Sequence, residues 1–302
     1  MYDVVVIGAG PAGLSAAIMI SRAGRSVCVV ATKTRRNSTA SSVQNVPYAH
    51  GTSPEVIYAK MERDALDCGV EFIWDEAVDA SSFDSHVSVA IRSGQQVEGR
   101  RLLLAAGRVD DLPAWLPEGV WGRSAFDCPY CHAHERRGGR FAVVGVDGET
   151  LTKAALARVH ASALTVVVSD AGTAKSPLAD LLRREGAEVV HGTVRDAVVT
   201  DAGALRLTTD QGSAIDADTL LLGNIVRPNR KFVEALGLDD TESGFPETTL
   251  FGQTSDPLVF SAGNGDGSSP YYMWTGAASS GINAGRLICE DLAFRSALLE
   301  SR

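Results

Sequence analysis

Three glycines near the start of the chain constrain its fold more than any other feature of the sequence. The segment YDVVVIGAGPAGLSAAIMISRAGRSVCVVAT is expected to form a buried apolar strand, a glycine turn, a helix closed by Gly24 and a second apolar strand. In such a βαβ unit Gly8 permits the tight turn, Gly10 lets a pyrophosphate approach the backbone, and Gly13 lets helix and strand pack closely. Because the helix N-terminus favours negative charge, the unit predicts a dinucleotide site.

The second strand of this unit lacks the acidic residue that usually contacts the ribose of the dinucleotide. The chain continues ATKTRR at this point, so we expect Thr32 or a backbone group to make the ribose contact. The same glycine spacing also occurs in ordinary turns. The strand–turn–helix context is therefore what carries the prediction.

A second βαβ unit begins at GRFAVVGVDGETLTKAALARVHASALTVVVSD, and its glycine pattern is broken. After Gly145 the second glycine is replaced by Asp147, and the closing small residue falls at Thr150. A carboxylate at the pyrophosphate position would place like charges together, at a cost of about 1 kcal/mol even in high dielectric. Asp170 stands where arginines would hold a 2′-phosphate. The sequence predicts a nucleotide-binding fold without a working NADPH site, and a remodelled phosphate turn is the alternative.

Composition narrows the class of protein and its partners. The chain has 302 residues, 45% of them hydrophobic and 22% charged, which predicts a globular protein of about two domains. Its net charge of -9 disfavours nucleic acid and anionic membranes as partners. No basic, apolar leader precedes the first strand and no apolar run reaches the length of a membrane span, so we expect a cytoplasmic protein.

The octapeptide CPYCHAHE at 128–135 concentrates two cysteines and two histidines. Three chemistries fit it: covalent haem attachment, a metal site, or a dithiol that cycles to a disulfide. Haem attachment normally requires export, which the N-terminus disfavours. Four zinc ligands within seven residues would bend the chain severely, and a second Cys-x-x-Cys is absent from the sequence, so no metal is expected. The redox dithiol is favoured, with a zinc module as the remaining alternative from another class.

The remaining segments suggest how the two domains are connected. The stretch DDLPAWLPEGVWGRS is rich in proline, glycine and tryptophan and is expected to cross between domains. The last part of the chain, from PLVFSAGNGDG onward, predicts a strand, a glycine turn, an aromatic stretch and a long terminal helix. Small residues at the start of that helix would let backbone N–H groups approach a ligand.

The order of these motifs resembles the low-molecular-weight thioredoxin reductases over essentially the whole chain. The motifs are Gly8-x-Gly10-Pro11-Ala12-Gly13, LLLAAG ending at Gly107, the Cys-x-x-Cys, GNIVRPN and VFSAGN. The resemblance implies an α/β fold of two Rossmann-like nucleotide-binding domains, with an FAD-binding domain at 1–114 and 226–302. A central NADPH-domain-like region at 115–225 would carry the redox cysteines. FAD as cofactor and a homodimer are implied as well.

The resemblance also indicates which residues contact the flavin. Arg36 would touch the FAD phosphates and Asn45 the ring, and Asn264 stands where the reductases have an aspartate near the ribityl chain. Met273 and Trp274, in a cluster with Tyr271 and Tyr272, would lie near the flavin or the substrate mouth. A polar surface loop and a core or dimer contact are the respective alternatives. The predicted cofactor-binding set is Gly8, Gly10, Pro11, Ala12, Gly13, Thr32, Arg36, Asn37, Asn45, Ala106, Gly107, Gly263, Asn264, Met273 and Trp274.

Within this superfamily CPYCHAHE is similar to a subgroup, the flavin-dependent dithiol oxidases. These enzymes close intramolecular disulfides in natural products such as gliotoxin, holomycin and the romidepsin-type depsipeptides. They carry Cys-x-x-Cys-His-Gly-aromatic-Glu where reductases carry Cys-x-x-Cys-Asp-Gly, and here Ala133 replaces the glycine and His134 the aromatic residue. They pass electrons to oxygen without NADPH, which agrees with Asp147 in the second unit.

The expected function is therefore that of an FAD-dependent dithiol oxidase acting on a small dithiol metabolite. A substrate thiolate would attack the Cys128–Cys131 disulfide, and the second substrate thiol would release the cyclic product. By resemblance Cys128 exchanges with substrate and Cys131 passes two electrons to FAD, with O₂ as the acceptor and H₂O₂ as the product. The alternative within the same fold is a thioredoxin-type disulfide reductase driven by NADPH or another donor.

Proton transfer to and from these thiols near pH 7 calls for a histidine. His132 is the first candidate for the general base, with Glu135 orienting a histidine or relaying its proton. His134 is a weaker candidate. A histidine that only caps the helix start is the alternative for at least one of the two.

Overall fold

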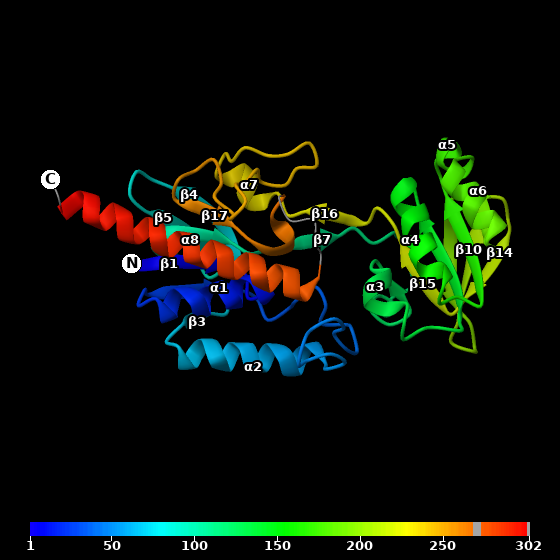
Figure 1. The fold of residues 1–302 in the computed structure, drawn as a ribbon, viewed down its shortest axis with the longest axis horizontal. Coiled ribbons are helices and arrows are strands. Elements are labelled where there is room, and N and C mark those ends of the chain that lie inside the picture. Colours follow the sequence, from blue (N-terminus) through cyan, green and yellow to red (C-terminus); the bar gives the residue numbers. More distant parts are fainter. Residues whose placement is uncertain (268–272, 301–302) are drawn as a thin grey trace. The chain divides into compact units, whose positions relative to one another are not determined.

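The computed structural model describes residues 1–267 and 273–300 and divides the chain into two compact units (Figure 1). The first unit comprises Met1–Ser38, Asn45–Val109 and Arg227–Arg302, and the second comprises Thr39–Gln44 and Asp110–Val226. The connecting strands β7 (Arg108–Asp110) and β16 (Val226–Pro228) pair with each other. The tryptophan-rich stretch after residue 110, expected as a crossing, belongs to the second unit, because Trp115, Leu116 and Trp121 pack against its core.

The first unit is built on a seven-stranded sheet that begins with the predicted βαβ unit. Its order is β3-β2-β1-β6-β5-β4, with β17 beside β6. β1 pairs in parallel with β2 and β6, whereas β4 and β5 are antiparallel. The long strand β6 pairs with β5 through its first half and with β17 through its last three residues. The strands are β1 (Tyr2–Ile7), β2 (Val27–Val30), β3 (Glu71–Ile73), β4 (Ala77–Ser82), β5 (Val87–Ile91), β6 (Gln96–Leu104) and β17 (Val259–Ser261).

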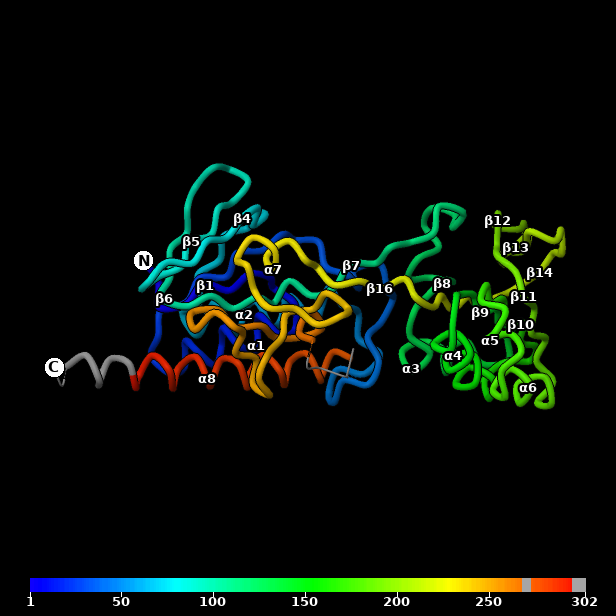
Figure 2. Tube along the Cα trace, turned by 90° about the horizontal axis from the view of Figure 1, so that it is seen from above, coloured from blue at the N-terminus to red at the C-terminus, as the bar shows by residue number. Residues whose placement is uncertain are grey.

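Alternate residues of β1 point into two separate cores. Val4 and Val6 pack with α1 (Pro11–Arg22) and α8 (Trp274–Glu300), and Val5 and Ile7 pack with β4, β5 and α7 (Lys231–Ala235). Figure 2 shows α1 and α8 on the same side of the sheet. α2 (Pro54–Asp67) packs beside α1, and Ser53 caps its first turn by accepting a hydrogen bond from the Val56 backbone N–H. The carboxyl ends of β1 and β2 meet at the glycine turn, which is where parallel α/β sheets bind ligands.

The second unit is a parallel sheet with helices on one face and a small antiparallel sheet on the other. Its strand order is β11-β10-β9-β15-β8. The helical face holds α3 (Pro129–His132), α4 (Gly148–Arg158) and α6 (Pro177–Arg184), and the three strands β12 (Val194–Val199), β13 (Leu205–Thr209) and β14 (Ala214–Ala217) cover the other. The remaining elements are β8 (Ala125–Phe126), β9 (Arg140–Gly145), β10 (Ala163–Val168), α5 (Ala171–Ala174), β11 (Glu188–His191), β15 (Thr219–Leu222) and, in the first unit, the 3-10 turn η1 (Gly263–Gly265).

Among the described residues, no helix is both long enough and apolar enough to span a bilayer.

Candidate functional site

Cys128 and Cys131 form a disulfide at the start of α3, directly after β8. Their Cα atoms are 5.3 Å apart. Cys128 is the extended residue before the helix, Pro129 fixes the first turn, and the Cys131 backbone N–H donates to the Cys128 carbonyl at 3.3 Å. One short helical turn therefore brings the two sulfurs together, which a Cys-x-x-Cys spacing allows and a redox dithiol requires.

The histidine that follows the disulfide is packed against an aromatic ring. The imidazole of His132 stacks on Phe126 with the ring centroids 4.0 Å apart and an angle of 21° between the planes. Burial lowers the pKa of His132 below its usual value, the negative charges of Asp127 and Glu135 oppose this, and the positive charge of Arg136 adds to it. The ring is therefore mainly neutral at pH 7 and can accept a proton.

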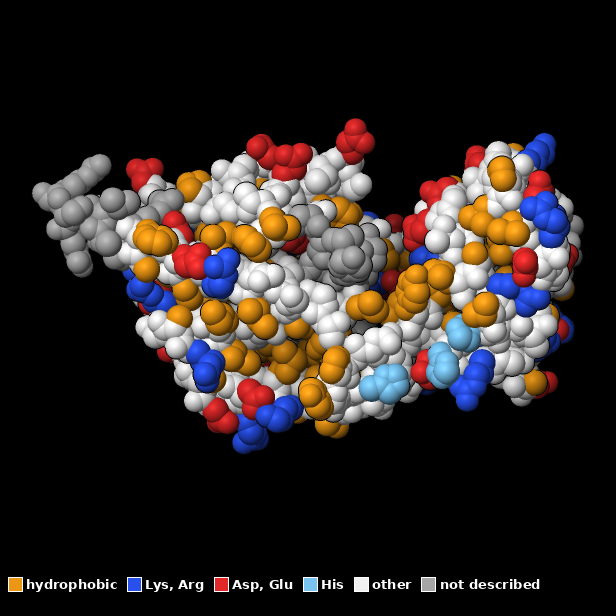
Figure 3. All heavy atoms as spheres, in the orientation of Figure 1, with side chains coloured by type: hydrophobic (Ala, Val, Ile, Leu, Met, Phe, Trp, Pro, Cys, Tyr) orange, Lys and Arg blue, Asp and Glu red, His pale blue; other side chains and the backbone are white. Residues whose placement is uncertain are grey.

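The side chains of His134 and Glu135 are more exposed to solvent than that of His132. Both are exposed, and Figure 3 shows histidine side chains at the molecular surface. The His134 ring lies edge-on to His160 at 5.9 Å, and its Nε2 is 3.5 Å from an Arg137 nitrogen. Among the described residues Glu135 makes no hydrogen bond to either histidine. The predicted role of Glu135 in orienting a histidine has no contact to support it, and its effect on His132 is one of charge alone.

Ala133 and Arg136 anchor this short helix to the second unit. Ala133 is 1% exposed and packs in the core with Phe141 and Leu151, so a small side chain is required where the dithiol oxidases carry glycine. Arg136 donates a hydrogen bond to the Arg123 carbonyl, and its guanidinium lies 5.4 Å from the ring centroid of Phe126. The segment carrying the disulfide is thus held by the packing of Ala133 in the core and by the contacts of Arg136 with Arg123 and Phe126.

The glycine turn of the first unit has the shape of a dinucleotide site. Gly8 has φ 109°, and a Cβ there would lie 2.4 Å from the Ala105 carbonyl oxygen. A Cβ on Gly13 would lie 1.9 Å from the Gly8 carbonyl oxygen, whereas a Cβ on Gly10 would meet no atom of the described residues within 4 Å. Gly10 is also the N-cap of α1 and makes no side-chain cap. Open space and an uncapped helix N-terminus therefore coincide where a pyrophosphate would bind, so these residues fit a dinucleotide cofactor.

Four of the other predicted cofactor residues, Ala106, Gly107, Gly263 and Asn264, gather around this turn. Gly263 has φ 81°, and a Cβ on it would lie 2.7 Å from Ala12. A Cβ on Gly265 would lie 2.8 Å from the Gly107 carbonyl oxygen, and Arg108 donates a hydrogen bond to the Asn264 carbonyl. The structure thus brings together Gly8, Gly10, Pro11, Ala12, Gly13, Ala106, Gly107, Gly263 and Asn264.

The loop after β2 and the start of α8 meet at a tyrosine that the sequence did not indicate. The Tyr58 hydroxyl on α2 donates to the Asn37 side-chain oxygen at 3.0 Å, and its ring lies 4.7 Å from that of Trp274. Tyr58 is 6% exposed, and burial raises its pKa. An aromatic residue on an amphipathic helix usually belongs to the core, so its position alone gave no signal.

Three other residues of the loop after β2 were predicted to contact the cofactor, namely Thr32, Arg36 and Asn45, and their positions give less support to that role. The Thr32 hydroxyl donates to the Thr34 carbonyl at 3.3 Å, so it is engaged within its own loop. Arg36 and Asn45 are exposed, and Asn45 has a left-handed φ of 59°. Met273 precedes α8 and is half-buried, whereas Tyr271 and Tyr272 lie outside the described residues.

The second glycine turn is filled by the protein's own side chains. Asp147 caps α4 by accepting a hydrogen bond from the Glu149 backbone N–H at 2.9 Å. The Asn224 side-chain oxygen accepts from the Val146 backbone N–H at 3.0 Å, and its amide donates to Asp147 at 3.1 Å. A Cβ on Gly145 would lie 2.2 Å from the Thr150 hydroxyl. Donors that would hold a phosphate are therefore already engaged, and two carboxylates, on Asp147 and Glu149, stand beside them.

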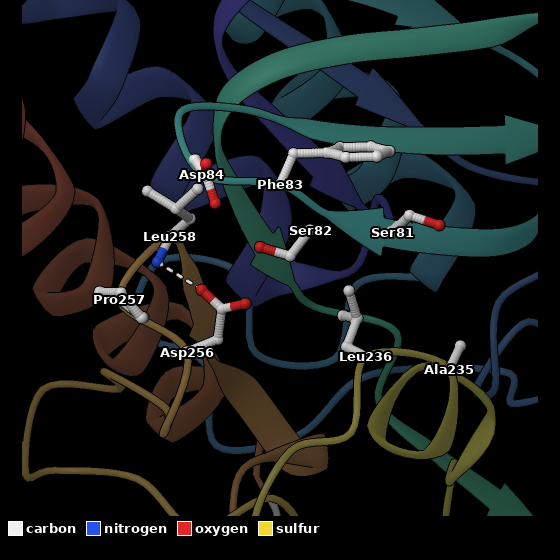
Figure 4. Close-up of a pocket in the computed structure, with 9 residues that line it drawn as sticks. All are labelled: Ser81, Ser82, Phe83, Asp84, Ala235, Leu236, Asp256, Pro257 and Leu258. Atoms are coloured by element: carbon white, nitrogen blue, oxygen red, sulfur yellow. Dashed lines mark hydrogen bonds between the residues drawn. The ribbon is translucent and has the colours of Figure 1, made fainter.

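A surface pocket of about 670 Å³ lies elsewhere on the first unit (Figure 4). It is formed by the β4–β5 turn, α7 and the segment before β17, and the Asp256 carboxylate at its wall accepts from the Leu258 backbone N–H at 2.7 Å. None of the predicted site residues lines it, and among the described residues no group of three or more His, Cys, Asp and Glu side chains could hold a metal ion.

An α/β chain with an open dinucleotide turn and a Cys-x-x-Cys disulfide defines the class of the disulfide oxidoreductases. The family model of the pyridine nucleotide-disulphide oxidoreductases matches residues 2–281, and the chain belongs to that family of flavoproteins. It is 29% identical over 330 aligned positions to thioredoxin reductase sirT of Leptosphaeria maculans, with 99% of this chain and 98% of that protein covered. It is 26% identical to thioredoxin reductase tcpT of Claviceps purpurea, with 87% and 86% covered.

A solved structure gives the same result for the fold. The crystal structure of HlmI superposes with a TM-score of 0.88 and 28% identity, covering 99% of this chain and 95% of that one. The expected resemblance to thioredoxin reductase-like flavoproteins and the expected fold class are both confirmed.

Proposed function

We propose that this protein is an FAD-dependent dithiol oxidase that forms an intramolecular disulfide in a small dithiol. The observation that carries the proposal is the Cys128–Cys131 disulfide next to a half-buried histidine whose pKa is lowered by burial, in a unit whose own dinucleotide turn is filled. The similarity of CPYCHAHE to the motif of disulfide-forming oxidases supports the same function. The partners would be the dithiol and O₂.

The reaction of the cysteine pair is a thiol–disulfide exchange in two steps. A substrate thiolate attacks one sulfur of the Cys128–Cys131 disulfide and breaks the S–S bond, giving a mixed disulfide and one protein thiolate. The second substrate thiol, after losing its proton, attacks the substrate sulfur of the mixed disulfide. The bond to the protein sulfur breaks, and the substrate is released as a cyclic disulfide. The substrate has then lost two electrons and two protons, and the protein holds the two electrons as a dithiol. By resemblance Cys128 is the sulfur that exchanges with substrate.

His132 is suited to take the substrate protons. Its imidazole is mainly neutral at pH 7 because burial lowers its pKa, and stacking on Phe126 fixes the plane of the ring. Asp127 and Glu135 stabilise the imidazolium that forms, through their negative charge. Exposed His134 lacks such a fixed environment, so we assign the base to His132.

The first unit would hold FAD at the glycine turn of β1 and α1. Gly10 and the uncapped start of α1 would receive the pyrophosphate, with the loop after β2 and Gly263 nearby. When bound, FAD supplies a two-electron acceptor that returns the dithiol to the disulfide and delivers the electrons to O₂ as H₂O₂.

A thioredoxin-type reductase driven by NADPH is the second candidate, because the relatives sirT and tcpT carry the name thioredoxin reductase. The second unit argues against NADPH as donor. Asp147 and Asn224 occupy the donors of its turn, and Asp170 caps α5 with its carboxylate at the position of a 2′-phosphate. Hydride donation by NADPH would need this turn to open.

Oxygen consumption tests the proposal. The purified flavoprotein is supplied in air with a small cyclisable dithiol, with a monothiol of similar size, or with NADPH and thioredoxin. We expect the dithiol to consume one O₂ and yield one H₂O₂ for each disulfide formed, with little turnover of the other two. Rapid NADPH oxidation dependent on thioredoxin would instead establish the reductase.

A further inference from the structure

The end of β2 lacks the carboxylate that a dinucleotide fold normally places there, and the structure brings one in from another helix. Residues 31–34 after β2 are Ala-Thr-Lys-Thr. Glu62, on the third turn of α2, lies against this loop instead. Its Oε2 is 3.6 Å from the Lys33 Nζ, and its Oε1 pairs with the Arg35 guanidinium.

Arg35 links Glu62 to the glycine turn itself. Its Nε donates to the Ala9 carbonyl at 3.2 Å, between Gly8 and Gly10, and one terminal nitrogen donates to the Lys33 carbonyl at 3.2 Å. The guanidinium also lies 4.3 Å from the ring centroid of Tyr58. A single side chain thus connects the phosphate turn, the loop after β2 and α2.

The charged side chains of Arg35 and Glu62 are both largely removed from water, so each depends on the other as its ion-pair partner. The side chain of Arg35 is 12% exposed and that of Glu62 is 19% exposed. A charge so far removed from water is costly unless it is paired, so loss of the Glu62 carboxylate would release Arg35 from its position at the turn. The exposed pair Lys60–Asp64 on the same helix, with 72% and 45% of the side chains exposed, has no such constraint.

The same face of α2 holds a second residue of the loop. Tyr58, one helical turn before Glu62, donates its hydroxyl to Asn37. Residues four apart lie on one face of a helix, so Tyr58 and Glu62 together fasten the two ends of the segment 33–37. At the carboxyl end of β3, Trp74 continues this surface, with the Lys33 ammonium 3.2 Å from its ring centroid.

We propose that Glu62 replaces the missing acid of β2 as a positioning residue, and that through Arg35 and Lys33 it shapes the site for the adenosine diphosphate half of a flavin dinucleotide. Arg35 and Lys33 place positive charge at the turn and beside the ribose position, and Glu62 holds both. The inference rests on the proposed function only in taking FAD as the dinucleotide. It assigns the specificity for FAD over FMN to a residue of α2.

Binding of three ligands by the flavin-free protein separates this role from a structural one. FAD, ADP and FMN are titrated into wild type, Glu62→Gln, Arg35→Lys and the control Asp64→Asn, by calorimetry for ADP and by flavin fluorescence for the others. A charge-assisted contact is worth enough that we expect FAD and ADP to bind about tenfold more weakly to Glu62→Gln, with FMN unchanged. Arg35→Lys keeps the charge and is expected to lose less, and Asp64→Asn is expected to match wild type.

The outcomes distinguish the inference from the proposed function. If wild type binds FAD and ADP but Glu62→Gln keeps both affinities, the inference is wrong and the proposed function stands. Equal weakening of FAD, ADP and FMN, with a lower melting temperature, would show a merely structural role and would also overturn it. If wild type binds neither FAD nor ADP, both the inference and the FAD-dependent function fail.

Discussion

The imidazole of His132 and the ring of Phe126 are stacked with centroids 4.0 Å apart, directly beside the Cys128–Cys131 disulfide in sequence. This contact joins the end of β8 to the first turn of α3. It fixes the histidine in a partly buried position in which the neutral form is favoured at pH 7. The proposed proton transfer depends on that environment.

Replacing His132 with glutamine is expected to slow the reaction of the disulfide with a dithiol by a factor of about 10² or more, because the general base is lost. In wild type the pKa of His132 is lowered by burial, so its base form persists below the usual histidine range. The rate constant should hold as pH falls from 7 and decline only below that lowered pKa. Stopped-flow measurements over pH 5–8 in the two proteins check this, with His134→Gln as the control. An unchanged acidic limb in His132→Gln would exclude His132 as the base.

Replacing either redox cysteine with serine is expected to abolish dithiol oxidation, since both sulfurs are needed for the exchange. In Cys131→Ser the remaining Cys128 thiolate should still attack the oxidised, disulfide form of the substrate, breaking its S–S bond and leaving a mixed disulfide on Cys128, which mass spectrometry of the intact protein would detect. The matched control is Cys289→Ser, because Cys289 belongs to α8 and its thiol pKa is raised by burial. Full oxidase activity in Cys128→Ser would remove the cysteine mechanism.

Two glycine substitutions at the first turn should differ in their effect on folding stability. A Cβ on Gly10 meets no neighbour among the described residues, so Gly10→Ala should fold with a nearly unchanged melting temperature but bind FAD more weakly. A Cβ on Gly13 would lie 1.9 Å from a backbone oxygen, so Gly13→Ala should lose about 2 kcal/mol of folding free energy or more. Denaturant unfolding and FAD titration of both variants measure this. Normal FAD affinity in Gly10→Ala would place the pyrophosphate elsewhere.

The turn of the second unit is expected to serve stability and not the reaction. Asp147 caps α4, so Asp147→Ala should lower the free energy of unfolding by about 1 kcal/mol. Dithiol oxidation should be unchanged, because the turn has no part in the exchange. A large loss of oxidase activity with an intact melting temperature would show that the turn takes part in catalysis.

The local motifs of both units could be predicted from the sequence because their contacts are short in range. The strand, turn and helix around Gly8 and Gly13 are encoded within one continuous segment, and so is the Cys128–Cys131 pair. The broken turn at Asp147 was also visible. The order of the two domains was predicted from the resemblance of the whole chain to the thioredoxin reductases. The hydrophobic periodicity of single segments does not contain this information.

Contacts between distant segments could not be predicted in the same way. Asn224 fills the second turn from the end of β15, and its left-handed φ of 58° gave no sequence signal. Glu62 and Tyr58 come from α2, where an acid and an aromatic residue are unremarkable. The expected contact of Glu135 with a histidine is not formed among the described residues, because Glu135 is exposed where Ala133 enters the core, and its role in the reaction stays a prediction.

Anaerobic reduction of the flavoprotein tests the central claim most directly. The visible absorbance of the oxidised flavin is followed after mixing with a small cyclisable dithiol in one experiment and with NADPH in another. The dithiol is expected to bleach the flavin through the Cys128–Cys131 pair, NADPH to leave it oxidised, and air to restore the colour with formation of H₂O₂. Rapid bleaching by NADPH, with no bleaching by the dithiol, would contradict the oxidase function and show that the second turn opens to a dinucleotide.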